Sequence, residues 1–224
     1  MRSILIFLDK VLKRLLFVDW TGFNLNYKSI DYVVGHYRLY DLIRDVPGHI
    51  IEFGTGSGRN SLIFGNIIKL NNQEKYKKIY GFDTFSGYPK NVLESNKDFD
   101  SNAHTHYSFE DVKLRMLQNK LSDVVNLVKG ELPKSLNIFL NSKDYSFSKD
   151  GLKISLIYVD CNDYETALKS LLTLEKYLST GAIIAVDENT LGGETKALEY
   201  FSKKIDRPIK QWTFGGVISS YIVI

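Results

Sequence analysis

Short apolar runs alternate with helical stretches from residue 49 onward, and this alternation constrains the fold more than any other feature. Five runs have the length of buried strands: His49–Phe53, Lys78–Phe82, Val124–Lys129, Ile154–Val159 and Ala182–Val186. Helical spacing marks Asn60–Leu70, the stretch with Leu168, Leu171, Leu172 and Leu178, and Glu194–Lys204. Repeated strand and helix predict a parallel sheet covered by helices on both faces.

The C-terminal residues have a different pattern. Two β-rich runs, Ile209–Phe214 and Val217–Ile224, flank Gly215-Gly216, and this predicts an antiparallel hairpin. Such an ending is unusual for dinucleotide-binding dehydrogenases. We therefore expect an α/β fold: a Rossmann-like, doubly wound, mostly parallel sheet of about seven strands with a C-terminal antiparallel hairpin and N-terminal helices.

Length and composition favour one globular domain. The 224 residues contain no repeat and no Pro/Gly-rich linker, so we assign residues 1–224 to a single domain with a helical N-terminal extension at 1–45. The net charge is +3, and no basic run is interleaved with aromatic residues, so we expect no nucleic-acid partner. Cys161 is the only cysteine, which excludes an intrachain disulfide and suits a reducing cytoplasm.

The segment Ser3–Trp20 is apolar but carries four charged residues, so it is too polar and too short to span a bilayer. No small-residue cleavage site follows it, which weakens a signal-peptide interpretation. Its apolar residues lie at helical spacing opposite the charges: Ile4, Phe7, Leu8, Val11, Leu12, Leu15 and Leu16. We expect a helix docked on the core or on a second subunit; a membrane-surface role is the alternative.

A glycine-rich turn follows the first expected strand and precedes a helix, with the sequence Glu52-Phe53-Gly54-Thr55-Gly56-Ser57-Gly58. Glycines allow a sharp turn and a close approach of the backbone to a ligand. Open α/β sheets bind ligands at this edge. Glu52 offers a carboxylate that suits a cationic ligand group. Asp83, at the end of the second strand, can accept hydrogen bonds from two ribose hydroxyls. A simple strand–helix turn with a solvated Asp83 is the alternative.

Several stretches resemble the macrocin O-methyltransferase family (the TylF-like enzymes), and the likeness runs from Val46 to the C-terminus. The matching stretches are VPGHIIEFGTGSGRNS (46–61), IYGFDTFSGYP (79–89), LVKGELPKSL (127–136), LIYVDCNDYETAL (156–168) and GAIIAVDE (181–188). The C-terminal hairpin is also the usual ending of the methyltransferase fold. The resemblance implies S-adenosylmethionine as cofactor, Mg²⁺, and methylation of a hydroxyl on a sugar or glycosylated small molecule. The cofactor-binding residues it implies are Glu52, Gly54, Thr55, Gly56, Gly58, Asp83, Thr84 and Gly130.

Acidic residues end the fourth and fifth strands: Asp160 at one, Asp187 and Glu188 at the other. Three converging carboxylates make a hard oxygen site that suits Mg²⁺, and the family holds its metal at equivalent positions. Glu188 departs from the family's paired Asp by one methylene. These acids also occur at such strand ends without a metal, where they bind basic side chains.

The base that takes the acceptor's proton is less clearly marked. The family's base position, two residues after Asp160, holds Asn162, which cannot accept a proton. Asp163 is our expected catalytic base, together with Asp160 in the catalytic set, and His104 and His106 are rivals. Cys161 is interpreted as a packing residue.

The long segment between the second and third strands contains Ser86–Tyr107, which is polar and aromatic and is expected to form a lid. A capping-box pattern begins a helix at Ser108. We weighed three other functions: a metal-independent methyltransferase with another acceptor, a nicotinamide or nucleotide-sugar oxidoreductase, and a cofactor-binding protein without catalysis. A homo-oligomer through the N-terminal helices is also possible within this family.

Overall fold

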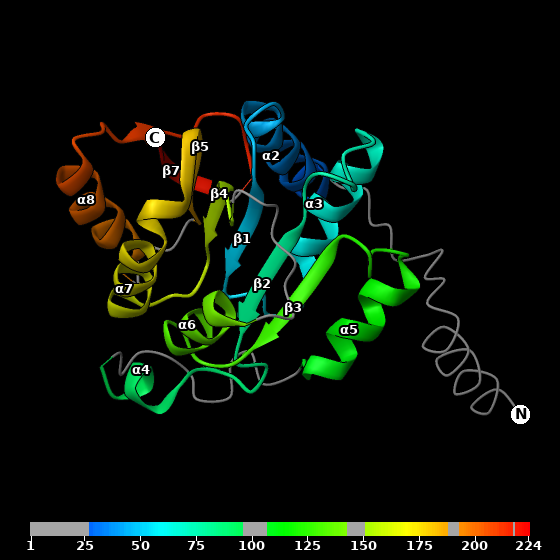
Figure 1. Ribbon diagram of the computed structural model, residues 1–224, viewed down its shortest axis with the longest axis horizontal. Helices are drawn as coiled ribbons and strands as arrows, with labels where there is room; N and C mark the ends of the chain where they lie inside the picture. Colours follow the sequence, from blue (N-terminus) through cyan, green and yellow to red (C-terminus); the bar gives the residue numbers. More distant parts are fainter. Residues whose placement is uncertain (1–26, 96–106, 143–150, 188–192, 217) are drawn as a thin grey trace, which may run out of the picture.

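The computed structural model describes residues 27–95, 107–142, 151–187, 193–216 and 218–224. Its centre is a seven-stranded sheet of order β3-β2-β1-β4-β5-β7-β6 (Figure 1). The strands are β1 (His49–Phe53), β2 (Ile79–Asp83), β3 (Val125–Lys129), β4 (Ile154–Val159), β5 (Leu178–Asp187), β6 (Lys210–Gln211) and β7 (Ile218–Val223). β1 to β5 run parallel, whereas β7 runs antiparallel to β5 and β6 antiparallel to β7. The predicted fold class is confirmed.

The helices of the described residues are α2 (Tyr27–Ile43), α3 (Arg59–Leu70), α4 (Lys90–Ser95), α5 (Phe109–Gln118), α6 (Lys134–Asn141), α7 (Tyr164–Leu174) and α8 (Glu194–Ile205). Helices α3, α5, α7 and α8 fall close to their predicted positions and α2 lies within the predicted helical extension, whereas α4 and α6 were not predicted. One expectation is wrong: Leu178 was placed on the apolar face of the helix after β4. A 3₁₀ turn, η1 (Glu175–Tyr177), ends that helix, and Leu178 is the first residue of β5.

Side chains alternate between the two faces of the sheet and form two cores. Ile50 of β1 packs in one core with residues from α2, α3 and α5. Ile51 and Phe53 of the same strand pack in the other core with residues from α6, α7 and α8. Both faces are therefore covered, and this leaves the carboxyl ends of the parallel strands as the edge where a ligand can enter (Figure 1).

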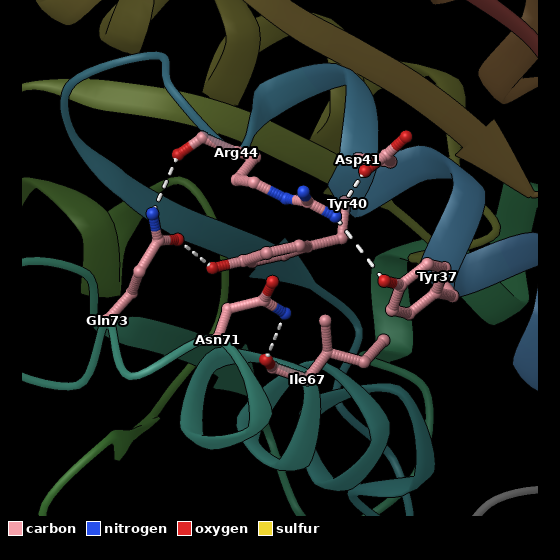
Figure 2. Close-up of polar contacts among 7 residues, drawn as sticks. All are labelled: Tyr37, Tyr40, Asp41, Arg44, Ile67, Asn71 and Gln73. Carbon is pink, nitrogen blue, oxygen red and sulfur yellow. Dashed lines mark hydrogen bonds and ion pairs between the residues drawn. The ribbon is translucent and has the colours of Figure 1, made fainter.

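Helix α2 lies against the end of α3 through polar contacts at its last turn (Figure 2). Gln73 donates to the backbone oxygen of Arg44 at 3.1 Å and accepts from the Tyr40 hydroxyl. Tyr40 and Ile43 are fully buried. Helix α2 lies within the predicted helical extension at 1–45 and packs on the domain core; the amphipathic segment Ser3–Trp20 lies outside the described residues.

Lys77 is a buried lysine that connects the start of β1 to β4. Its ammonium group donates to the backbone oxygens of Ile43, Val46 and Gly48 at 2.9–3.2 Å and to the Ser155 hydroxyl at 3.0 Å. Only 4% of the residue is exposed. These acceptors replace water around the ammonium, so Lys77 fixes the turn that leads into the central strand.

Two predicted local motifs are confirmed. Ser108 caps α5 by accepting from the Asp111 N–H at 3.2 Å, while Asp111 accepts from the Ser108 N–H at 3.3 Å. The C-terminal hairpin is also present, although β6 is only two residues long. No helix in the described parts of the chain has the length and apolarity to cross a membrane.

Candidate active site

A cavity of about 330 Å³ opens at the carboxyl ends of β1, β2 and β4. Its lining brings together the glycine turn after β1, the end of β2, the start of α4 and the turn after β4. The lining residues are Gly54, Thr55, Gly56, Ser57, Arg59, Asn60, Phe82, Asp83, Thr84, Gly87, Tyr88, Pro89, Val92, Tyr107, Gly130, Leu132, Asp160, Cys161, Asn162 and Thr166. Six of the eight predicted cofactor residues are in this set.

Glycine is required for a different reason at each of the three positions in the turn. A Cβ on Gly54 would lie 1.8 Å from the backbone oxygen of Asp160, so only glycine allows the ends of β1 and β4 to approach this closely. Gly56 has φ +50 and open space where a Cβ would lie, which suits a ligand that approaches the backbone. Gly58 does not line the cavity. A Cβ there would meet Val112 and Met116 of α5 at 2.7 Å, so glycine is required for helix packing, and its contact with the cofactor stays a prediction.

Asp83 lines the cavity and also holds the glycine turn. One carboxylate oxygen accepts from the Gly56 N–H at 2.8 Å, and the other accepts from the Phe85 N–H at 2.7 Å. The oxygen that accepts from Gly56 keeps a second lone pair for a ligand hydroxyl, whereas the other also accepts from the Thr84 hydroxyl at 3.5 Å. Asp83 can therefore bind a ribose hydroxyl, as predicted, while it also accepts from the Gly56 N–H, a contact that the sequence did not reveal.

Glu52 lies behind the cavity wall and is fully buried. Its carboxylate accepts from the Ser61 hydroxyl of α3, and its second oxygen has no hydrogen-bond partner. Burial raises the pKa of Glu52 to about 7. Because it does not line the cavity, Glu52 supports the glycine turn from behind, and direct contact with the cofactor stays a prediction.

Asp160 reaches the cavity from the end of β4 and belongs to a buried polar network. Its carboxylate accepts from the Asn60 amide at 3.2 Å. The Asn60 side-chain oxygen in turn accepts from the Tyr32 hydroxyl and lies 3.2 Å from His36 Nε2. Burial lowers the pKa of His36 to about 4. Sequence reasoning missed Tyr32, His36 and Asn60 because they lie on helices far from Asp160 in the chain.

Negative charge converges on Asp160. Burial, followed by the charges of Asp187, Glu194 and Glu52, raises the pKa of Asp160 well above its usual range. A bound cation would relieve this repulsion, and a divalent metal at this position stays a prediction. The third predicted ligand, Glu188, lies outside the described residues, and within the described residues no group of three or more His, Cys, Asp or Glu side chains could hold a metal.

Glu194, the first residue of α8, holds the turn that follows Asp160. One carboxylate oxygen accepts from two successive backbone N–H groups, Cys161 at 2.5 Å and Asn162 at 2.8 Å. Asn162 has φ +59, and this left-handed conformation lets both N–H groups point to one acceptor. Burial raises the pKa of the fully buried Glu194 to about 7. We did not predict this residue, because its partners are backbone groups.

Asp163 does not line the cavity. It is the N-cap of α7, and its carboxylate accepts from the Thr166 N–H at 2.8 Å. Only 6% of the residue is exposed. Asp163 as the catalytic base stays a prediction, and what the structure shows of its carboxylate is a cap at the start of α7. Cys161 lines the cavity, and no cysteine nucleophile is indicated because burial raises its pKa well above the usual value.

Tyr88, Pro89 and Val92 close one side of the cavity at the start of α4. Burial raises the pKa of Tyr88 to about 12, with Asp160 and Glu194 among the charges nearby. Part of the predicted lid is thus an ordered wall. The rest, with His104 and His106, lies outside the described residues, and the closing motion stays a prediction.

The chain is similar to known methyltransferases. A family model described as a methyltransferase domain matches residues 51–189. The solved structure of CalS11, a calicheamicin methyltransferase, has a TM-score of 0.71 at 21% identity and covers 96% of this chain and 90% of its own. Its apo structure, described as TDP-rhamnose 3'-O-methyltransferase, has a TM-score of 0.67 at 21% identity, over 96% and 92%. The O-methyltransferase NovP has a TM-score of 0.62 at 17% identity, over 97% and 98%.

No curated protein matched the sequence. At these identities the solved structures establish the fold, whereas the family model spans more than half of the chain. The matched region, residues 51–189, contains the glycine turn, Asp83, Asp160 and Asp187. The chain therefore belongs to the methyltransferase domain family and is an S-adenosylmethionine-dependent methyltransferase.

Proposed function

We propose that this enzyme is an O-methyltransferase of the macrocin type that methylates a hydroxyl of a sugar or glycosylated small molecule, with assistance from Mg²⁺. One observation carries the proposal: the partly buried Asp160 lines the same cavity as the glycine turn and Asp83. The cofactor and a carboxylate that can act on an acceptor hydroxyl thus share one space. The similarity to sugar and natural-product O-methyltransferases supports it.

Different residues contact the cofactor and the acceptor. Asp83 accepts hydrogen bonds from the ribose hydroxyls, and Gly56 leaves room for the cofactor against the turn. When bound, S-adenosylmethionine would supply its sulfonium methyl group to the acceptor oxygen, with cleavage of the carbon–sulfur bond. The products are a methyl ether, S-adenosylhomocysteine and a proton, which the protein must receive.

Asp160, Asp187 and Glu188 would hold Mg²⁺, and this metal would lower the pKa of a bound hydroxyl. The negative charge of Asp187, which helps to raise the pKa of Asp160, supports this ligand set because a cation would offset it. With Asp163 committed to capping α7, the described acid best placed to receive the proton directly is Asp160. Asn60 donates to its carboxylate, and Glu194 holds the turn that follows it.

A metal-independent enzyme with a different acceptor is the second candidate. The observation that favours it is Asn162 at the family's base position, held there by a backbone contact with Glu194. In that case Asp160, whose pKa is raised by burial and by neighbouring acids, is the general base alone.

Turnover in chelator separates the two candidates. The purified enzyme is incubated with S-adenosylmethionine and a panel of nucleotide sugars and glycosides, and methylated products are identified by mass. EDTA should abolish product formation and Mg²⁺ should restore it. Full activity in EDTA would establish the metal-independent candidate, and methylation of nitrogen or carbon instead of oxygen would contradict the proposed reaction.

A further inference from the structure

Arg59 is the first residue of α3 and lines the cavity directly after the glycine turn. Of the described residues that line this cavity, Arg59 is the only one with a positive charge, whereas Asp83 and Asp160 carry negative charges. Its guanidinium forms no ion pair with an acidic side chain in the described parts of the chain. The charge of Arg59 is therefore available to an anionic group of a ligand that occupies the cavity.

Helix α2 orients the Arg59 side chain. The guanidinium lies over the ring of Tyr32, 3.9 Å from the ring centroid. Tyr32 is itself fixed, because only 8% of the residue is exposed and its hydroxyl donates to the Asn60 side chain. Stacking of a planar guanidinium on an aromatic face restricts the conformations that the arginine adopts. Helix α2 therefore holds a positive charge beside the glycine turn.

The start of α3 also favours an anion at this place. The N-cap of α3 is Gly58, which has no side chain to cap the helix, and the first turn of α3 contains no acidic residue. The N–H groups and the dipole at the start of a helix attract negative charge. The guanidinium of Arg59 and the first turn of α3 thus present two positive elements on the same side of the cavity.

The sheet order indicates which end of the cofactor reaches Arg59. Strand β1 lies between β2, which ends at Asp83, and β4, which is followed by Asp160. A cofactor whose ribose lies at Asp83 therefore extends its methionyl end across the turn after β1. Burial raises the pKa of Tyr32, the charge of Arg59 lowers it and the charge of Asp160 raises it, so both charged groups lie near Tyr32. Arg59 is thus on the methionyl side of the cavity.

We propose that Arg59 binds the methionyl carboxylate of S-adenosylmethionine and that the Tyr32 ring orients Arg59 for this contact. The carboxylate is the only anionic group of the cofactor, because its sulfonium and ammonium groups are cations. A guanidinium suits it through its fork of N–H donors. The inference concerns the cofactor alone, so it is independent of the acceptor and of Mg²⁺.

Calorimetric titration of the full chain with two ligands tests the contact. S-Adenosylhomocysteine carries the carboxylate, and decarboxylated S-adenosylhomocysteine differs from it by this group alone. The wild-type chain should bind S-adenosylhomocysteine about tenfold or more tightly than the decarboxylated ligand. Arg59→Gln should weaken S-adenosylhomocysteine binding by about tenfold and should not weaken binding of the decarboxylated ligand. Equal losses for the two ligands, or an unchanged preference between them, would overturn the proposal.

Arg38→Gln is the matched control for the loss of charge. Arg38 is an exposed arginine of α2 that also lies over an aromatic ring, 5.6 Å from the centroid of Phe214, and it does not line the cavity. The substitution should leave both affinities unchanged. Arg59 is exposed as well, so Arg59→Gln should retain the fold, which thermal melting verifies. A loss of preference in Arg38→Gln equal to that in Arg59→Gln would contradict a direct contact.

Two substitutions of Tyr32 test its orienting role. Tyr32→Phe keeps the ring under the guanidinium and removes the hydroxyl, so the preference for S-adenosylhomocysteine should remain. Tyr32→Leu removes the ring, and the preference should decrease. A wild-type preference in Tyr32→Leu would overturn the role of Tyr32 and leave that of Arg59. If the wild-type chain binds no S-adenosylhomocysteine, the inference fails together with the cofactor, whereas failure to methylate a hydroxyl contradicts only the proposed function.

Discussion

The substitution Glu194→Gln is expected to change how stability depends on pH. Burial raises the pKa of Glu194 from 4.5 to about 7, so the folded protein keeps a proton that the unfolded chain releases. The stability gained in this way is complete below pH 4.5 and is lost as the pH rises through 7. Between pH 5 and 7.5, the two pKa values give a loss of about 2 kcal/mol.

Gln keeps an oxygen that can accept from Cys161 and Asn162, but it does not titrate. The free energy of unfolding of Glu194→Gln should therefore rise by about 2 kcal/mol relative to wild type between pH 5 and 7.5. Urea denaturation followed by circular dichroism at several pH values measures it. Glu199→Gln, an exposed position on the same helix, is the matched control.

The comparison with wild type is essential because other groups titrate in the same range. Burial lowers the pKa of His36 and of His49 to about 4, so their contributions increase with pH, opposite to that of Glu194. Glu52, with a pKa raised to about 7 by burial, acts in the same direction as Glu194. Parallel pH profiles for wild type and Glu194→Gln would refute the reasoning.

Three further outcomes are expected. Asp83→Ala should weaken S-adenosylhomocysteine binding by about tenfold or more in calorimetry, because it removes ribose acceptors and frees the Gly56 turn; an unchanged dissociation constant would exclude Asp83 from the site. Asp160→Asn should abolish turnover with nearly unchanged S-adenosylhomocysteine affinity, and retained turnover would count against both candidate mechanisms. Lys77→Met should lower the free energy of unfolding by about 1–3 kcal/mol, because the backbone oxygens around its ammonium lose their donor. The exposed control Lys75→Met should leave the free energy of unfolding unchanged, and equal effects of the two substitutions would contradict a structural role for Lys77.

The sequence by itself determined the layered fold and the position of the ligand-binding edge. Strand-length apolar runs such as Ile154–Val159 bury both faces, which requires helices on each side, and the glycine turn after β1 must lie at the carboxyl edge. Gly54 and Asp83 could be assigned from local spacing, because each follows directly from the strand that carries it. These features depend on residues that are adjacent in the chain, so they can be inferred from the sequence.

Only the tertiary structure decided which polar groups meet. Asn60 and Glu194 contact Asp160 and the turn after it, and Tyr32 joins them through Asn60; these residues lie 34 to 128 positions from Asp160 in sequence, and no local pattern marks such pairs. Asp163 shows the opposite case: three residues from Asp160 in sequence, its carboxylate caps a helix instead of lining the cavity. Periodicity predicts on which face of a helix or strand a side chain lies. The direction of a carboxylate at a strand end depends instead on the hydrogen-bond partners that tertiary packing places near it.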